Sequence, residues 1–526
     1  MKSTERCFYF RSDLYQHHHF LARCQTARWL ARLAGQYLRG ISNCAGLTYK
    51  GIKTLRTGMT NQSIPSAKPA VRAPASAALP RETALFALAA GVIILASRLL
   101  AAGLLDIHPD PVHLDGSYQH LPAQQLHDGL LDALLTLHSQ PPFWNFLLGI
   151  AAKACGAQDT CMIQLIWSSH LVLSVLTAAC MFAALRLLAQ SRRLAWLLPL
   201  AYILSPAVFY YENFLLYAHF TSAFFALSCL CALLFLKTQK TLCFLQFCAC
   251  LAVLSLTWTL FHPIYILLVA GLLLFKTAAT PARSAVLALT LAVTLLPSVK
   301  NKAVFGIFSS GSWLGLNASQ TAPEPIEGCS FKTFAQVHGL IGQHTGTALN
   351  DPRMIPYSKT CLKKSLEVIA ASPVQYAAGV VVRAFTSLSL WPNEYFYPPL
   401  NWDRFPKIPD TKRVLTAENK IIIDPSLSRF LTLALNLFAL IALAELARRD
   451  QDRTRRAFFQ VMLLSVVLFL GVAHAVNGPE QERMRYTLHP LFWGLYAVVF
   501  QEAARRAGRL TRRIRVKALP ETGSSQ

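Results

Sequence analysis

Two groups of polar residues in this chain have the side-chain types that a group-transfer reaction needs. Asp115 carries a carboxylate that could serve as a general base, and Tyr118 follows it within the stretch 113–149. Far along the chain, Arg483 and Arg485 offer planar cations that suit bidentate binding of phosphate. A base for an attacking hydroxyl and a cation for a departing phosphate form a minimal set for transfer from a phosphate-linked donor, unlike the two carboxylates of glycoside hydrolysis.

The composition around these groups is that of a membrane protein. Of the 526 residues, 54% are hydrophobic and only 14% are charged, and the mean hydropathy is +0.38. Soluble domains carry about 25% charged residues. The apolar residues also form runs of about 17–25, the length that crosses a hydrocarbon layer of ~30 Å. The sequence therefore predicts an all-α polytopic membrane protein.

The apolar runs predict about ten transmembrane helices, with eleven to thirteen as the alternative. We expect a first outer loop that carries amphipathic helices and a large outer segment between late spans. His262-Pro263 marks the tip of a hairpin, because the run around it is too long for one crossing and is basic at both ends. The expected spans are 83–104, 162–188, 194–211, 214–236, 242–258, 260–275, 284–299, 426–447, 457–476 and 486–503.

The formal net charge of +24 follows this topology. Lys and Arg concentrate in 1–81, 448–456 and 504–526 and in short connections, which is a positive-inside pattern with both termini in the cytoplasm. The charge thus indicates contact with anionic lipid and argues against a nucleic-acid partner.

The chain divides into five parts on this interpretation. Residues 1–58 are either a regulatory extension or precede a true start at Met59, and both alternatives stay open. The parts are a basic, largely disordered cytoplasmic extension (1–80), a transmembrane catalytic module (81–299) with the first outer loop 105–161, an outer, periplasmic segment (300–425), C-terminal transmembrane helices (426–503) and a basic cytoplasmic tail (504–526).

Two pairs of cysteines fall in the outer segments. Cys155 with Cys161, and Cys329 with Cys361, could each close a disulfide in an oxidising compartment, although the sequence leaves the pairing open. Six others fall inside expected spans, where a free cysteine behaves as a small apolar residue.

Each candidate site residue also has a structural interpretation. Asp115 could merely cap a helix that begins near Gly116, and a His before Pro263 is often structural. Arg483 and Arg485 could form an exposed ion-pair cluster with Glu480 and Glu482, which contributes little. The candidates for binding substrate are Tyr118, Glu212, His262, Lys300, Arg483 and Arg485.

Short motifs resemble those of one enzyme class. Asp115, Tyr118, Gly129 and Pro141-Pro142 resemble the first loop of type C glycosyltransferases, closest to family 39, the protein O-mannosyltransferase and lipid A aminoarabinose transferase group. The turn Leu204–Phe214 and the stretch Glu482–Tyr486 followed by Pro490 resemble later elements of that group. Relatives often carry two adjacent acids where this chain has Asp115-Gly116, which puts a bound Mg²⁺ or Mn²⁺ in doubt. Asp115 and Asp128 are the candidate metal ligands, and Asp110 or Glu212 could add a carboxylate.

The resemblance implies an inverting glycosyltransferase of the cell envelope, in a bacterial inner membrane with its site on the periplasmic face. The donor would be a polyprenyl-phosphate-linked sugar, and the acceptor a hydroxyl of a lipid, glycan or protein. Asp115 would be the catalytic base. A transporter or flippase of a lipid-linked intermediate, and a polymer ligase with a lipid-linked donor, are the alternatives.

Overall fold

A computed structural model describes residues 78–105, 109, 120–341, 345–389, 425–476 and 481–518. Within these ranges the chain is helical and has no strand. The helices are α2 (Ala78–Leu105), α4 (Ala123–Asp128), α5 (Leu130–Thr136), α6 (Phe143–Cys155), α7 (Asp159–Leu187), α8 (Arg192–Ile203), α9 (Pro206–Asn213), α10 (Tyr217–Thr238), α11 (Thr241–Thr257), α12 (Pro263–Phe275), α13 (Pro281–Phe305), α14 (Leu314–Thr321), α15 (Phe331–Val337), α16 (Thr345–Leu349), α17 (Met354–Ala371), α18 (Pro373–Ser389), α20 (Pro425–Arg449), α21 (Arg453–Val476) and α22 (Gln481–Ala518).

The all-α, multi-pass membrane fold is confirmed, but the count of about ten crossings is not. Among the described residues, six helices are long and apolar enough to cross a membrane, namely α2, α7, α10, α13, α20 and α21. The number rises to eight if each of two bent pairs, α8–α9 (46°) and α17–α18 (104°), is one span. The helix α12, with 13 residues, is too short for a full crossing, and α11, with 17, is at the lower limit of length.

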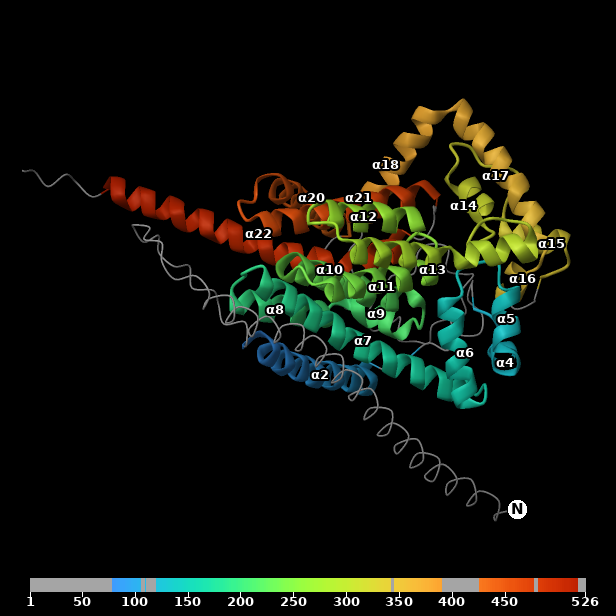
Figure 1. Ribbon diagram of the computed structural model, residues 1–526, viewed down its shortest axis with the longest axis horizontal. Coiled ribbons are helices and arrows are strands. Elements are labelled where there is room, and N and C mark those ends of the chain that lie inside the picture. The colour runs from blue at the N-terminus through green and yellow to red at the C-terminus, as the bar shows by residue number, and fades with distance from the viewer. Residues whose placement is uncertain are drawn as a thin grey trace, which may run out of the picture.

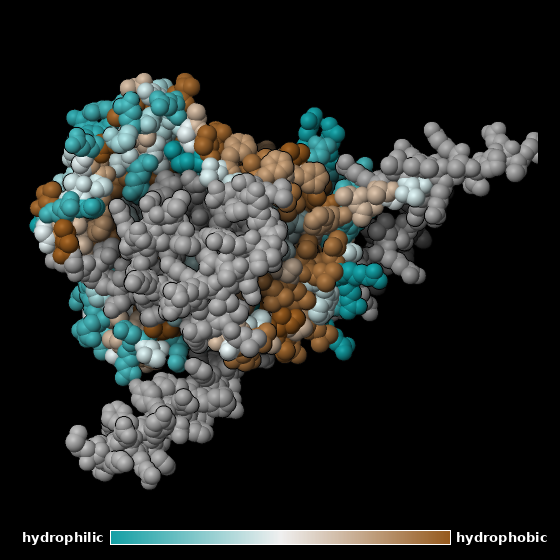
Figure 2. All heavy atoms as spheres, turned by 180° about the vertical axis from the view of Figure 1, so that it is seen from behind, coloured by the Kyte–Doolittle hydropathy of each residue, from teal (hydrophilic) through white to brown (hydrophobic). Residues whose placement is uncertain are grey.

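Helix α10 forms the centre of the bundle. Its residues are apolar almost all round, as expected for a helix buried on every side, and 89% of its apolar window is buried. It packs against α7, α11 and α22. The corresponding windows of α2 and α20 are only 28% buried, and their exposed leucines and isoleucines contribute to the apolar belt that Figure 2 shows from behind.

The short helices α4 to α6 and α14 to α17 gather at one end of the bundle, which we call the loop end (Figure 1). The opposite end, which we call the basic end, carries the start of α8 and the C-terminal part of α22. Helix α22 continues to Ala518, so the part of the expected tail up to that residue is helical. Residues 1–77 lie outside the described part of the chain.

Both cysteine pairs form disulfides, and both lie at the loop end. Cys155–Cys161 joins the end of α6 to the start of α7, and Cys329–Cys361 joins the turn before α15 to α17. The six free cysteines among the described residues are buried within α7, α10 and α11. This division agrees with an oxidising environment at the loop end.

Candidate active site

The described chain enters the loop end at His120 and is fixed there by two side chains of α6. Trp144 donates its Nε1–H to Nε2 of His120 at 2.8 Å, and Oδ1 of Asn145 accepts the Leu121 backbone N–H at 2.9 Å. Asp115 and Tyr118 precede this anchor and lie outside the described residues. The anchor nevertheless identifies the end of the bundle from which their segment departs.

Arg483 and Arg485 lie in the first turn of α22 and are buried, with 7% and 2% of their surfaces exposed. The Arg483 guanidinium carbon lies 5.2 Å from the ring centroid of Tyr217 and 5.5 Å from that of Trp258. Tyr217 begins α10 and Trp258 caps α11, so three helix ends meet around this cation. Such burial is inconsistent with an exposed ion-pair cluster on the surface.

Glu212 is fully buried and its carboxylate is held by a cation that the sequence interpretation missed. Arg98, in the middle of α2, donates from Nε to one carboxylate oxygen at 2.6 Å and from Nη2 to the other at 2.9 Å. Ser174 of α7 donates to the same carboxylate. Because both oxygens are engaged by the protein, Glu212 ties helices together and is poorly placed to bind substrate.

Arg98 also supports the break between α8 and α9. Its Nη2 donates to the carbonyl of Ile203 at 2.8 Å, at the end of α8, and its guanidinium lies 3.6 Å from the ring centroid of Phe209. An arginine within an apolar span requires a partner. This rule is the signal in the sequence that could have predicted the pairing.

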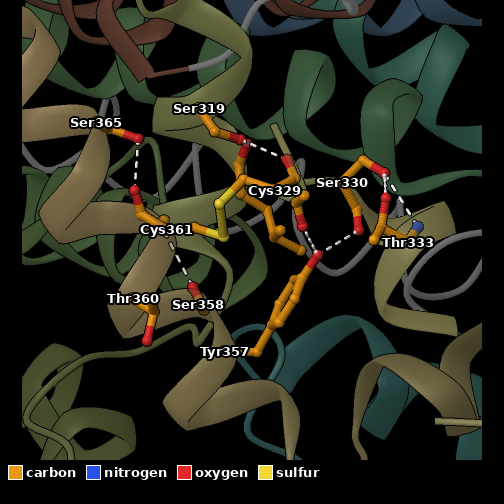
Figure 3. Close-up of a disulfide and its surroundings, with 12 residues drawn as sticks. Ser319, Cys329, Ser330, Thr333, Tyr357, Ser358, Thr360, Cys361 and Ser365 are labelled. Carbon is orange, nitrogen blue, oxygen red and sulfur yellow. Dashed lines mark hydrogen bonds between the residues drawn. A yellow bond between two sulfur atoms is a disulfide. The ribbon is translucent and has the colours of Figure 1, made fainter. Parts of the chain in front are cut away.

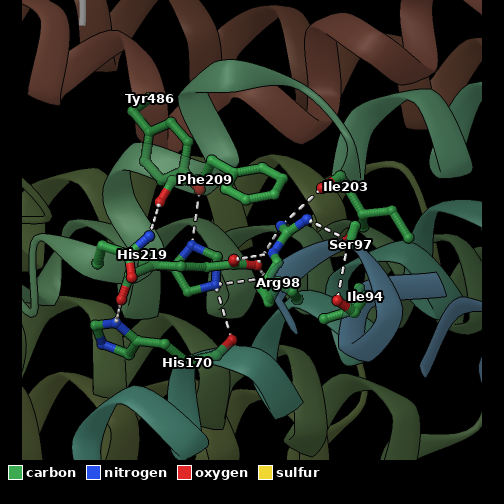
Figure 4. A network of polar contacts seen from close by, with 11 residues as sticks. Ile94, Ser97, Arg98, His170, Ile203, Phe209, His219 and Tyr486 are labelled. Atoms are coloured by element: carbon green, nitrogen blue, oxygen red, sulfur yellow. Dashed lines mark hydrogen bonds and ion pairs between the residues drawn. The ribbon is translucent and has the colours of Figure 1, made fainter. Parts of the chain in front are cut away.

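Two histidines extend this network to α22 (Figure 4). His219 contacts the Ser174 hydroxyl through Nε2 at 3.0 Å and the Tyr486 hydroxyl through Nδ1 at 2.7 Å. His170 donates from Nδ1 to the backbone carbonyl of Glu212 at 3.1 Å. The network therefore joins α2, α7, α9, α10 and α22, and it ends next to Arg485. The sequence interpretation did not single out either histidine.

Lys300 and His262 have local structural partners. The Lys300 ammonium donates to the carbonyls of Leu134 and Leu135, at 3.4 and 3.2 Å, and to that of Leu137. It thereby satisfies carbonyls at the end of α5, which have no partner within that helix. His262 caps α12, where its Nδ1 accepts the Ile264 N–H at 3.3 Å. Neither residue contacts the Arg483 site in these interactions.

A second set of contacts fixes His138 and Ser139, just before Pro141-Pro142, to Ser312 and Asn350. The buried His138 contacts the Ser312 hydroxyl and the Asn350 carbonyl, both at 2.9 Å, while the Asn350 side chain accepts the backbone N–H groups of His138 and Ser139. Burial lowers the pKa of His138. A Cβ at Gly311 would lie 2.9 Å from the Ser139 carbonyl oxygen, so glycine permits this close approach.

The region of helices α14 to α17 contains a small core of its own. Phe334, Leu349 and Met354 are buried together with Leu316 around the Cys329–Cys361 disulfide. Figure 3 shows how Tyr357 supports this disulfide, since its hydroxyl donates to the backbone carbonyls of Gly328 and Ser330. Helix α14 begins at Leu314 and contributes Leu316 to this core.

The described residues offer no ligand set for Mg²⁺ or Mn²⁺. No group of three His, Cys, Asp or Glu side chains comes together in this part of the chain. The exposed carboxylate of Asp128 is bonded to Gln124, at 2.8 and 2.9 Å, and to His127 at 3.0 Å. These hydrogen bonds lower the pKa of Asp128, with His127 the larger cause. We derive no chemical step through a metal.

Comparison with known proteins gives no match to a protein-family model, a curated protein or a solved structure. The fold and the buried groups at the loop end therefore define the class: a multi-pass, all-helical membrane protein.

Proposed function

We propose that this chain is an inverting membrane glycosyltransferase that moves a sugar from a polyprenyl-phosphate carrier to a hydroxyl acceptor. The observation that carries the proposal is the buried Arg483 at the loop end, whose guanidinium lies over the rings of Tyr217 and Trp258. A buried cation at the end of a membrane bundle suits the phosphate of a lipid whose tail lies in the bilayer.

The chemistry requires one base and one phosphate-binding cation. The acceptor oxygen attacks the anomeric carbon, the bond from that carbon to the phosphate oxygen breaks, and polyprenyl phosphate leaves as an anion. Asp115, five residues before the anchored His120, takes the proton of the acceptor hydroxyl. Arg483 stabilises the charge that develops on the leaving phosphate.

The aromatic groups around Arg483 support this role. Trp144, which anchors His120, also contacts the Tyr217 ring edge to face at 6.4 Å between centroids. Trp144 therefore contacts both His120, five residues after Asp115, and Tyr217, whose ring lies under Arg483. The proposal puts Asp115 and the phosphate site at this same end of the bundle.

The buried ion pair argues against the transporter alternative. Transporters use intramembrane carboxylates that exchange protons or ions, whereas both oxygens of Glu212 are engaged by Arg98 and Ser174. A polymer ligase would share the lipid-phosphate site, so the acceptor distinguishes it from a monosaccharide transferase.

Release of polyprenyl phosphate from a panel of polyprenyl-phosphate monosaccharides by the purified protein tests the proposal. A positioned base contributes about 10²–10⁴ in rate, so Asp115→Asn should lower turnover at least about a hundredfold. Asp132→Asn is the matched control, because it removes an exposed carboxylate from the same loop, and it should retain activity. Binding without turnover in the native chain, or full activity of Asp115→Asn, would contradict the proposal.

A further inference from the structure

A shallow depression of about 370 Å³ lies at the basic end of the bundle, far from the candidate active site. It is lined by Arg192, Arg193, Trp196 and Leu197, all from the first turns of α8 (Figure 1). The lining combines two adjacent cations with an indole and a leucine that is 61% exposed. Along the start of α8, two arginines are thus followed by a tryptophan and then by a leucine.

Neighbouring helices hold Trp196 and the start of α8 in place. The Trp196 ring packs edge to face against Phe86 of α2, with centroids 5.1 Å apart, and against Phe182 of α7 at 5.8 Å. Ser191 caps α8 by accepting the Leu194 N–H at 3.3 Å, and its own N–H donates to the Gln501 side chain of α22 at 2.6 Å. Three helices, α2, α7 and α22, therefore hold the start of α8 in place.

The local charge is only partly neutralised. Glu82 accepts from Arg186 at 3.2 Å and lies 3.9 Å from Nε of Arg192, whose side chain stays 65% exposed. Arg193 is exposed, and no ion pair of this residue occurs among the described residues. The single carboxylate of Glu82 is thus shared by Arg186 and Arg192, so it cannot neutralise both.

The position of the two arginines in the helix also favours an anion. The first turn of α8 contains both arginines and no acidic residue. Cations at a helix N-terminus are unfavourable, because the helix dipole is positive there. A bound anionic group would offset both the dipole and the excess charge.

We propose that this depression binds the headgroup of an anionic phospholipid of the phosphatidylglycerol type. The Arg192 and Arg193 guanidinium groups bind the phosphate, and Trp196 lies at the depth of the headgroups, where tryptophan is enriched in membrane proteins. Leu197, one turn of helix after Arg193, lies beside the first part of an acyl chain. The site is separate from the proposed transfer reaction.

The competing explanation is that the arginines only set the topology of the chain. A matched control separates the two, because Arg448 and Arg449 also form an adjacent pair at a helix end, where Arg449 is bonded to Glu445 at 2.9 Å, and neither residue lines the depression. R448Q/R449Q therefore removes the same charge without removing the proposed site.

Native mass spectrometry of the full chain, with dioleoyl-phosphatidylglycerol and dioleoyl-phosphatidylcholine as probes, tests the proposal. The native chain should retain phosphatidylglycerol in preference to phosphatidylcholine. R192Q/R193Q should weaken phosphatidylglycerol binding about thirtyfold, from about a fivefold loss for each arginine near the surface, whereas R448Q/R449Q should bind like the native chain. Equal losses in the two variants, or no preference in the native chain, would overturn the proposal.

If R192Q/R193Q fails to insert into the membrane, a variant that keeps both positive charges still tests the proposal. R192K/R193K keeps the topological charge but loses the planar fork of arginine, so it should insert normally and bind phosphatidylglycerol several-fold more weakly. If R192K/R193K bound phosphatidylglycerol as tightly as the native chain, positive charge alone would explain the binding, and the proposed headgroup site would be wrong.

Discussion

The Arg98 guanidinium lies 2.6 Å from the carboxylate of Glu212, although the two residues are 114 positions apart in the sequence. The pair is almost completely buried, with 2% and 0% of the two side chains exposed. It connects α2 to α9 and, through Ser174 and His219, to the first turns of α22. The ion pair thus anchors α2 to a polar network that reaches α22.

Removing one partner of this pair should destabilise the fold strongly. Arg98→Met leaves a buried carboxylate without its cation, which costs about 3–5 kcal/mol. The double variant Arg98→Met/Glu212→Met should recover much of that loss, because no buried charge remains. Thermal unfolding of the detergent-solubilised protein measures both. Arg186→Met is the control, since its pair with Glu82 is partly exposed and should contribute less than about 1 kcal/mol; additive effects at Arg98 and Glu212 would contradict this account.

The two disulfides should differ in their contributions to stability. Cys329–Cys361 closes a segment of 32 residues, whereas Cys155–Cys161 closes one of 6. Loop-closure entropy predicts about 3.7 kcal/mol for the longer loop and about 2.2 kcal/mol for the shorter one. The unfolding temperatures of Cys329→Ser and Cys155→Ser compare them. A larger loss from Cys155→Ser would show that entropy of the unfolded chain does not dominate.

Gly315 should not tolerate a side chain. A Cβ at this position would lie 1.8 Å from the backbone oxygen of Ser358, so alanine would force α14 away from α17. We expect Gly315→Ala to cost at least about 3 kcal/mol, the upper part of the range for overpacking. Gly471→Ala is the matched control, because no heavy atom lies within 4 Å of its Cβ. Similar melting temperatures for the two variants would refute the close packing of α14 on α17.

The contacts of His138 should make the loop end sensitive to acid. Burial is the main cause that lowers the pKa of His138, with Lys300 adding to it, while the Asn350 carbonyl and Asp351 oppose it. Because its pKa is lowered in the folded state, folding favours neutral His138. Its contribution to the free energy of unfolding is therefore complete above about pH 6.5, the pKa of histidine in the unfolded chain. Stability should fall as the pH drops below 6.5 and level off below the pKa of the folded state. The unfolding temperature of His138→Gln should depend less on pH in this window, and an unchanged slope would contradict the assignment.

Much of the helical architecture could be predicted from the sequence, because each span is encoded locally. The predicted span 162–188 corresponds to α7, and the hairpin tip at His262-Pro263 falls between α11 and α12. Breaks within polar or amphipathic segments were harder to predict. Gly129 divides the amphipathic stretch of the first loop into α4 and α5, and Ser372-Pro373 bends α17–α18 by 104°.

The polar network could be predicted only in part. Arg98 lies within an apolar run and required a partner, but the choice of Glu212 depends on how α2 and α9 pack, which no local pattern encodes. His170 and His219 resemble ordinary polar residues within apolar helices until tertiary contacts bring them together. The roles of Asp115 and Tyr118 remain predictions, because both residues lie outside the described part of the chain.

Binding of polyprenyl phosphate, the product common to every sugar donor of this kind, tests the central claim that Arg483 binds a lipid phosphate. The account predicts that the native protein binds this lipid in detergent, that Arg483→Gln binds at least about tenfold more weakly, as loss of a charge-assisted hydrogen bond implies, and that Arg353→Gln, at an exposed arginine of the same end, binds normally. Equal affinities of the native and Arg483→Gln proteins, or no binding by either, would contradict it.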